Sequence, residues 1–315
     1  MTINKATLAI LKALSFGGIE VEASRHLADL KRIDPMSIFY KTMDYPVYNG
    51  DYEVPTRIFF PNETAFQHTG KNTLPVMMFI HGGGWVTESV ENYQRVCARM
   101  ANATNHIVVA VEYRLAPEFP FPTGLEDCYA VAKALFTDQF MLNVDPDDIT
   151  IVGDSAGGNL TAALSLMARD RGEFMPKRQI LIYPATNNDY SENSIFPSVQ
   201  ENGSDYLLTA GKMRDYINLY ASCEEDKQNP YFAPILEEDL SNQPITLVLS
   251  AEFDPLRDEG EAYGRRLREA GNLVKIYRIK DALHGFFALG IKNLHVQESF
   301  EYINTFLKAS ALEVE

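Results

Sequence analysis

The sequence contains few cysteines, one tryptophan and no excess of glycine or proline. Its 315 residues include 3 cysteines, 19 glycines and 16 prolines. These ordinary Gly and Pro contents exclude collagen-like and low-complexity chains. The odd number of cysteines leaves at least one unpaired. We therefore expect reduced, buried thiols at Cys97, Cys128 and Cys223, in a reducing compartment.

Positive charge is also scarce. The chain has 28 Lys and Arg against 43 Asp and Glu, a formal net charge of −15. Binding to nucleic acid or to an anionic membrane surface needs a basic footprint, so neither partner is expected. A small neutral molecule suits this charge better than an anionic one.

Long hydrophobic runs are missing as well. No segment approaches the roughly 20 apolar residues of a membrane span. The N-terminal run Ala6–Leu11 is shorter than the apolar region of a signal peptide, and the spacing of Leu8, Leu11 and Leu14 indicates an amphipathic helix instead. We therefore expect a cytoplasmic protein.

Short apolar runs that alternate with helical patterns make up most of the chain. Strands are predicted over residues 52–60, 76–80, 106–111, 149–152, 180–183, 245–250 and 274–279. Helices are predicted over residues 91–103, 123–141, 157–169, 258–270 and 296–310, with Asp258 and Glu261 as a capping box for the fourth. This alternation predicts an α/β fold, a mostly parallel sheet with helices on both faces.

Residues 185–240 interrupt the alternation, because they lack clear strands and indicate only one helix, near 210–221. We interpret them as an insertion that forms a helical cap together with residues 1–40, which also have a helical pattern. The catalytic domain then comprises residues 41–184 and 241–315.

The pentapeptide Gly153–Gly157 has the pattern G-x-S-x-G, directly after a predicted strand and before a predicted helix. A tight turn there would lift the Ser155 hydroxyl above the sheet and direct the helix dipole at developing negative charge. A plain glycine-rich turn explains the pentapeptide alone equally well. If the turn is tight, Asp154 would hold the loop by a hydrogen bond.

A second glycine-rich segment, His81–Gly84, follows another predicted strand. Glycines allow backbone N–H groups to approach an oxyanion, although a flexible turn is the simpler explanation of this segment by itself.

A nucleophilic serine needs a base and an orienting carboxylate. Only His284 and His295 follow Ser155 in the chain, and His284 lies just after a strand, whereas His295 has the pattern of a surface residue. Asp254 also follows a strand, where catalytic groups gather in such sheets. Glu252 is a neighbouring candidate for a supporting or solvated role.

Five segments, in this order, resemble the hormone-sensitive-lipase family of esterases in its GDSAG branch: HGGGW (81–85), YRLAPE (113–118), GDSAGGN (153–159), DPLRDEG (254–260) and HGF (284–286). The resemblance implies an α/β-hydrolase fold with a cap. It further implies Ser155 as nucleophile, His284 as base and Asp254 as orienting acid, an oxyanion hole of Gly83, Gly84 and Ala156, and a homodimer.

These residues predict a carboxylesterase that cleaves soluble esters of short acyl chains, acetyl to about hexanoyl, through an acyl-enzyme. Trp85, Tyr183 and Phe286 would line the pocket, unless they only pack in the core. No metal or cofactor is expected, because the chain lacks HExxH, P-loop and GxGxxG motifs. A peptidase or amidase, and a receptor of the same fold without turnover, remain alternatives.

Overall fold

The computed structural model describes residues 18–29, 34–69, 74–140, 142–288 and 294–309. The helix expected around Leu8, Leu11 and Leu14 lies outside these residues. At the centre is an eight-stranded sheet in the order β1-β2-β4-β3-β5-β6-β7-β8. Its strands are β1 (Lys41–Asn49), β2 (Tyr52–Phe60), β3 (Val76–Ile80), β4 (Ile107–Val111), β5 (Ile149–Asp154), β6 (Arg178–Ile182), β7 (Ile245–Phe253) and β8 (Val274–Leu283).

The six strands from β3 to β8 are parallel, and β1 and β2 form an antiparallel edge. Every residue of β3 and β4 is buried, as expected for continuous apolar runs with both faces covered. β1 is absent from the sequence-based prediction. It is a partly exposed edge strand that contains Pro46, which an edge strand tolerates because one of its sides needs no hydrogen bonds.

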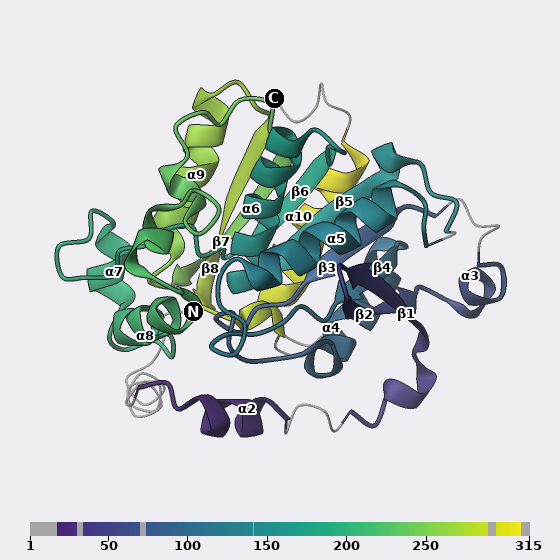
Figure 1. Cartoon of the computed structure of the whole chain (residues 1–315), viewed down its shortest axis with the longest axis horizontal. Coiled ribbons are helices and arrows are strands. Elements are labelled where there is room, and N and C mark those ends of the chain that lie inside the picture. Colours follow the sequence, from purple (N-terminus) through teal and green to yellow (C-terminus); the bar gives the residue numbers. More distant parts are fainter. Residues whose placement is uncertain (1–17, 30–33, 70–73, 141, 289–293, 310–315) are drawn as a thin grey trace.

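Helices cover both faces of the sheet, as predicted (Figure 1). The α5, α6 and α9 helices pack on one face, and α4 and α10 pack on the other. Their bounds are α4 (Val90–Thr104), α5 (Thr123–Phe136), α6 (Ala156–Arg171), α9 (Arg257–Glu269) and α10 (Leu294–Lys308), and a short α3 (Glu63–Gln67) lies beside β1 and β2. Within the described part of the chain, no helix is long and apolar enough to cross a membrane.

Residues 185–240 contain no strand and carry the short helices α7 (Pro197–Asn202) and α8 (Ala210–Tyr220) and the 3₁₀ turns η4 (Glu224–Gln228) and η5 (Pro234–Leu236). Of the described residues before β1, only α2 (Val21–Asp29) and η2 (Ser37–Phe39) are helical, so the helical prediction for residues 1–40 was too broad. A hydrogen bond of 3.2 Å from Ile19 N to Asp215 Oδ2 joins the segment before α2 to α8.

Two local predictions were wrong. Asp258 does not cap α9: the helix begins at Arg257, and the Asp258 carboxylate accepts a hydrogen bond from Ser198 N at 2.8 Å and pairs with Arg257. The expectation of three buried thiols fails at Cys223, which is exposed beside η4, whereas Cys97 and Cys128 are buried.

Candidate active site

Ser155 occupies a sharp turn between β5 and α6. Its φ of 55° lies in the left-handed region, which is uncommon for a residue with a side chain. The turn leaves no room beside it. A Cβ on Gly153 would lie 2.2 Å from Gly157 O, and a Cβ on Gly157 would lie 2.0 Å from Ile80 O. The glycines on both sides of Ser155 are therefore required by close backbone approach.

Three side chains meet at the carboxyl ends of parallel strands. Ser155 Oγ lies 2.9 Å from His284 Nε2, and His284 Nδ1 lies 2.7 Å from Asp254 Oδ2. These residues follow β5, β8 and β7 respectively. Asp254 is fully buried, and its second oxygen accepts a hydrogen bond from Leu256 N at 2.9 Å, which fixes the carboxylate. A carboxylate on Nδ1 leaves Nε2 free to accept the proton of the Ser155 hydroxyl.

The glycine-rich loop is fixed through its carbonyl groups. His81 Nδ1 donates to Gly82 O at 2.8 Å, and both the N–H and the hydroxyl of Thr87 donate to Gly83 O at 2.9 Å. In a trans peptide the C=O and the following N–H point in opposite directions. The N–H groups of Gly83 and Gly84 are thus directed away from these partners, and neither donates to an acceptor among the described residues.

Asp154 connects the glycine-rich loop to the serine turn. Its carboxylate accepts hydrogen bonds from Gly82 N at 2.9 Å, Tyr93 Oη at 2.9 Å and Tyr183 Oη at 3.2 Å. Burial raises the pKa of Asp154. The loop-holding role expected for this residue is the one it has, and the bond to Gly82 uses the N–H that the family resemblance left out of the oxyanion hole.

Two cavities adjoin the site: one is lined by both Ser155 and His284, and the other by His284. One, of about 200 Å³, is bordered by Gly83, Gly84, Ala156 and residues of the insertion, including Leu208, Met213 and Tyr216. The other, of about 740 Å³, lies between α2 and the insertion and shares Leu208, Tyr216 and His284 with the first. Both segments that were expected to form a cap therefore contribute walls.

The three aromatic residues expected in the pocket lie mainly in the core. Trp85 borders the smaller cavity, but it is 2% exposed and stacks on Tyr220 with ring centroids 4.6 Å apart. Tyr183 and Phe286 are not among the residues that line either cavity. The ring centroids of Tyr183 and His284 are 4.8 Å apart, and those of Phe286 and Tyr183 are 5.2 Å apart. Tyr183 therefore supports the imidazole directly, and Phe286 supports it through Tyr183.

Three supporting residues were not found by sequence reasoning. Asn159 accepts from Trp85 Nε1 at 3.2 Å and donates to Phe232 O at 2.9 Å, which ties α6 to the end of the insertion. Arg25 and Glu259 make comparable long-range contacts, described below. Asn159 and Glu259 belong to the GDSAGGN and DPLRDEG segments, so these two had a local signal, whereas Arg25 lies in no motif.

Among the residues that the structure describes, no group of three or more His, Cys, Asp or Glu side chains is arranged to hold a metal ion.

Known proteins share this architecture. Residues 77–288 match the model of a family described by the α/β-hydrolase fold. An arylesterase of Saccharolobus solfataricus is 34% identical over 283 residues, 90% of this chain and 88% of the relative. An ethyl acetate hydrolase of Pseudomonas putida is 34% identical over 76% of this chain and 73% of the relative. The structure of a hyperthermophilic esterase from Pyrobaculum calidifontis superposes with a TM-score of 0.84 at 35% identity, covering 98% of both chains.

The fold and the serine turn place the molecule among the α/β hydrolases. Together with the relatives, they show that the chain belongs to the hormone-sensitive-lipase family of esterases within that superfamily. It is a carboxylesterase.

Proposed function

We propose that the chain hydrolyses short-chain esters through an acyl-enzyme on Ser155. The observation that carries this proposal is the hydrogen-bonded series Ser155–His284–Asp254, with distances of 2.9 and 2.7 Å, beside the glycine-rich loop. A series of this kind activates a hydroxyl that is otherwise a weak nucleophile.

In the first half-reaction, His284 Nε2 takes the proton as Ser155 Oγ attacks the ester carbonyl carbon. The resulting oxyanion accepts hydrogen bonds from the N–H groups of Gly83, Gly84 and Ala156, which border the same cavity. His284 then protonates the leaving alcohol, and the C–O bond breaks. Asp254 holds the imidazole and stabilises its positive charge.

In the second half-reaction, a water molecule gives its proton to His284 and attacks the acyl carbon. Collapse of the second oxyanion breaks the bond to Ser155, which recovers its proton from His284. The carboxylic acid leaves, and the enzyme returns to its starting state.

The cavity sizes support a short acyl chain. The 200 Å³ cavity beside the glycine-rich loop accommodates acetyl to about hexanoyl groups, while the 740 Å³ cavity takes the larger alcohol part. The relative whose name specifies ethyl acetate acts on a small acetyl ester. Segments 1–40 and 185–240 together serve as the cap that selects the substrate, which is a small neutral ester.

The test compares variants of His284 and His295, the two histidines that follow Ser155 in the chain. His284→Gln and Ser155→Ala should lower kcat on p-nitrophenyl acetate by about 1,000-fold or more. His295→Gln, the other histidine after the serine, should keep near wild-type turnover. A series of p-nitrophenyl esters should peak between acetyl and hexanoyl. Near-normal kcat in His284→Gln would refute the assignment of the base, and a maximum at dodecanoyl would refute the chain-length preference.

A further inference from the structure

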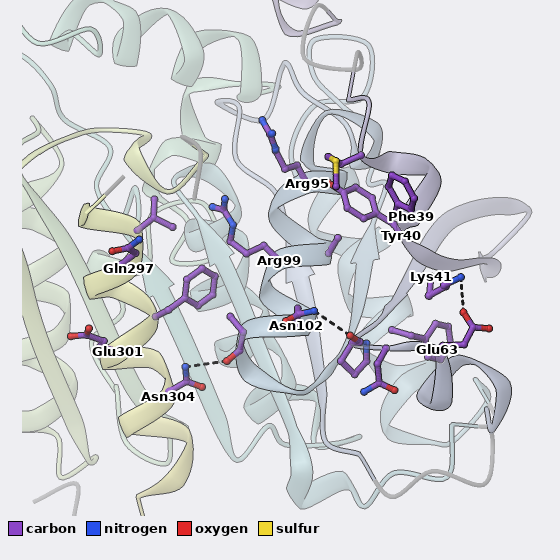
Figure 2. Close-up of a pocket in the computed structure, with 18 residues that line it drawn as sticks. Phe39, Tyr40, Lys41, Glu63, Arg95, Arg99, Asn102, Gln297, Glu301 and Asn304 are labelled. Carbon is purple, nitrogen blue, oxygen red and sulfur yellow. Dashed lines mark hydrogen bonds and ion pairs between the residues drawn. The ribbon is translucent and has the colours of Figure 1, made fainter. Parts of the chain in front are cut away.

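A third cavity lies on the opposite side of the sheet from α5 and α6, between α4 and α10. Its volume is about 800 Å³, within the range of small-molecule sites. No residue that lines it also lines either cavity at Ser155. It is therefore a separate feature of the molecule. Figure 2 shows the residues that line it.

Hydrogen bonds and an ion pair fix the walls of this cavity at one end. Asn304 Nδ2 on α10 donates to Ala103 O at 3.2 Å, Asn102 Nδ2 on α4 donates to Pro61 O at 3.4 Å, and Lys41 pairs with Glu63 at 2.6 Å. These contacts join α10 to α4, α4 to the end of β2, and β1 to α3. The elements around the cavity are therefore tied to one another by side-chain contacts.

The wall is largely apolar and partly open to solvent. Phe60 and Phe300 are buried beneath it, whereas Phe39 is 63% exposed and Met36 is 50% exposed. Exposed large apolar side chains that surround a hollow are typical of a ligand site. This wall would suit a ligand with a hydrocarbon or aromatic group.

Two arginines lie one helical turn apart on α4 and line the same cavity: Arg95 and Arg99. Figure 2 shows them away from the end that the Asn304 and Asn102 contacts close. Burial and the neighbouring charge of Arg95 lower the pKa of Arg99. A ligand anion at this position would relieve the mutual repulsion of the two guanidinium groups.

Other charged groups also surround the cavity. Lys41 and Glu63 neutralise one another. Glu301 on α10 lines the cavity, and Asp34 lies next to it, where it accepts the hydroxyl of Tyr40 at 2.6 Å and the N–H of Met36 at 3.0 Å. In a chain of net charge −15, a pair of lining arginines is a local exception that favours an anion.

We propose that this cavity binds an amphipathic carboxylate, with its hydrocarbon body against Phe39, Phe60 and Phe300 and its carboxylate on Arg95 and Arg99. A guanidinium matches a carboxylate in two parallel hydrogen bonds, so the pair provides both charge and orientation. This inference does not depend on the mechanism proposed for Ser155.

The test is isothermal titration of the full chain with decanoate and, separately, with 1-decanol. The tightest binding of decanoate should have a Kd at least tenfold lower than that of decanol. The double variant Arg95→Gln/Arg99→Gln should remove that difference. Arg265→Gln, which removes an exposed arginine outside the cavity, should keep it. Ala98→Phe, which fills the cavity from α4, should weaken decanoate and decanol alike. Carboxylate binding at the Ser155 site would be the same in all four proteins, so the differences isolate the cavity.

Equal binding of decanoate and decanol to the wild type would overturn the proposal, and this result does not depend on any variant folding. Unchanged decanoate affinity in both the double variant and Ala98→Phe would also overturn it. Sedimentation velocity supplies the last check. A wild-type dimer that Ala98→Phe dissociates and decanoate does not affect would show that a second copy of the chain covers this face instead.

Discussion

At the scale of single residues, a buried carboxylate next to the nucleophile controls two loops at once. Asp154 accepts hydrogen bonds from Gly82 N, Tyr93 and Tyr183, so it sets how the glycine-rich loop faces the serine turn. A residue of this kind acts on catalysis through the position of backbone amides rather than by contact with the reacting carbonyl.

We expect Asp154→Ala to lower the free energy of unfolding by about 1–3 kcal/mol, because it leaves buried donors without acceptors. It should also lower kcat about 10- to 100-fold with little change in KM, because the oxyanion donors shift while the binding walls remain. Urea denaturation and steady-state kinetics measure the two effects.

Tyr93→Phe is the matched control, since it removes one hydrogen bond to Asp154 and keeps the bond to Gly82. It should cost about 1 kcal/mol in stability and leave kcat nearly unchanged. An equal loss of kcat in the two variants, or unchanged kcat in Asp154→Ala, would contradict a role through the loop.

At the scale of elements, the Arg25 side chain attaches α2 to the loops that follow β3 and β4. Arg25 donates to Val86 O and Ala116 O, each at 3.0 Å, and forms a two-pronged pair with Glu118 at 2.8 Å for each prong. The pairing lowers the pKa of Glu118 to about 2. The pair is therefore complete above the ordinary carboxyl pKa of 4.5 and is lost only as the pH falls toward 2.

Arg25→Lys should loosen α2, because an ammonium group cannot reproduce the fork to Glu118 and the two carbonyl contacts. We expect faster amide hydrogen exchange over Val21–Asp29 at neutral pH, with α8 and the sheet unchanged. Activity should fall more for esters with bulky alcohols than for p-nitrophenyl acetate, because α2 borders only the larger cavity. Arg171→Lys, at another Arg–Glu pair far from α2, is the control. Unchanged exchange in Arg25→Lys would disprove the attachment.

The elements also show how far local pattern determines this fold. The bounds of β2 and β3 agree with the prediction because their alternating or continuous apolar patterns are local. β1 was missed because its partner, β2, is what makes it a strand. The cap assigned to Asp258 was wrong because Ser198, 60 residues earlier, binds that carboxylate.

The difference between local patterns and contacts of distant residues also applies to the site. Ser155, Asp254 and His284 stand in recognisable motifs in a fixed order, so their proximity could be anticipated. Arg25 acts across 93 residues to Glu118, and Glu259 across 69 residues to Tyr190. Glu118 and Glu259 lie in the YRLAPE and DPLRDEG segments, but neither segment indicates its distant partner, and Arg25 and Tyr190 lie in no motif. The cavity between α4 and α10 likewise depends on segments that meet only in three dimensions.

At the scale of the whole molecule, Glu259 joins the catalytic part of the chain to the start of the insertion. Its Oε1 accepts hydrogen bonds from Thr186 N at 2.8 Å, Asn187 N at 3.2 Å and Tyr190 Oη at 2.7 Å. The residue is fully buried on α9, and burial raises its pKa from 4.5 to about 8. The protonation state of Glu259 therefore affects the stability of α9 and of the start of the insertion together.

The direction in which pH changes stability through Glu259 can be tested. Between pH 4.5 and about 8 the folded chain keeps the Glu259 proton and the unfolded chain releases it. The contribution of Glu259 to stability is therefore complete below pH 4.5 and is lost as the pH rises toward 8, by at most about 1.4 kcal/mol per pH unit. Glu259→Gln cannot titrate, so urea denaturation from pH 5 to 9 should show the variant gaining on the wild type as the pH rises.

Glu261, two residues along α9, provides a control of opposite sign. Although burial opposes it, hydrogen bonds from Arg278 and Ser250 lower the pKa of Glu261. Its contribution is thus present above the ordinary carboxyl pKa and is lost in acid. Glu261→Gln should therefore be less stable than the wild type from pH 5 to 9, with no gain as the pH rises. A Glu259→Gln variant whose stability differs from the wild type by a constant amount across this range would show that Glu259 is ionised throughout, and that its three donors outweigh the cost of burial.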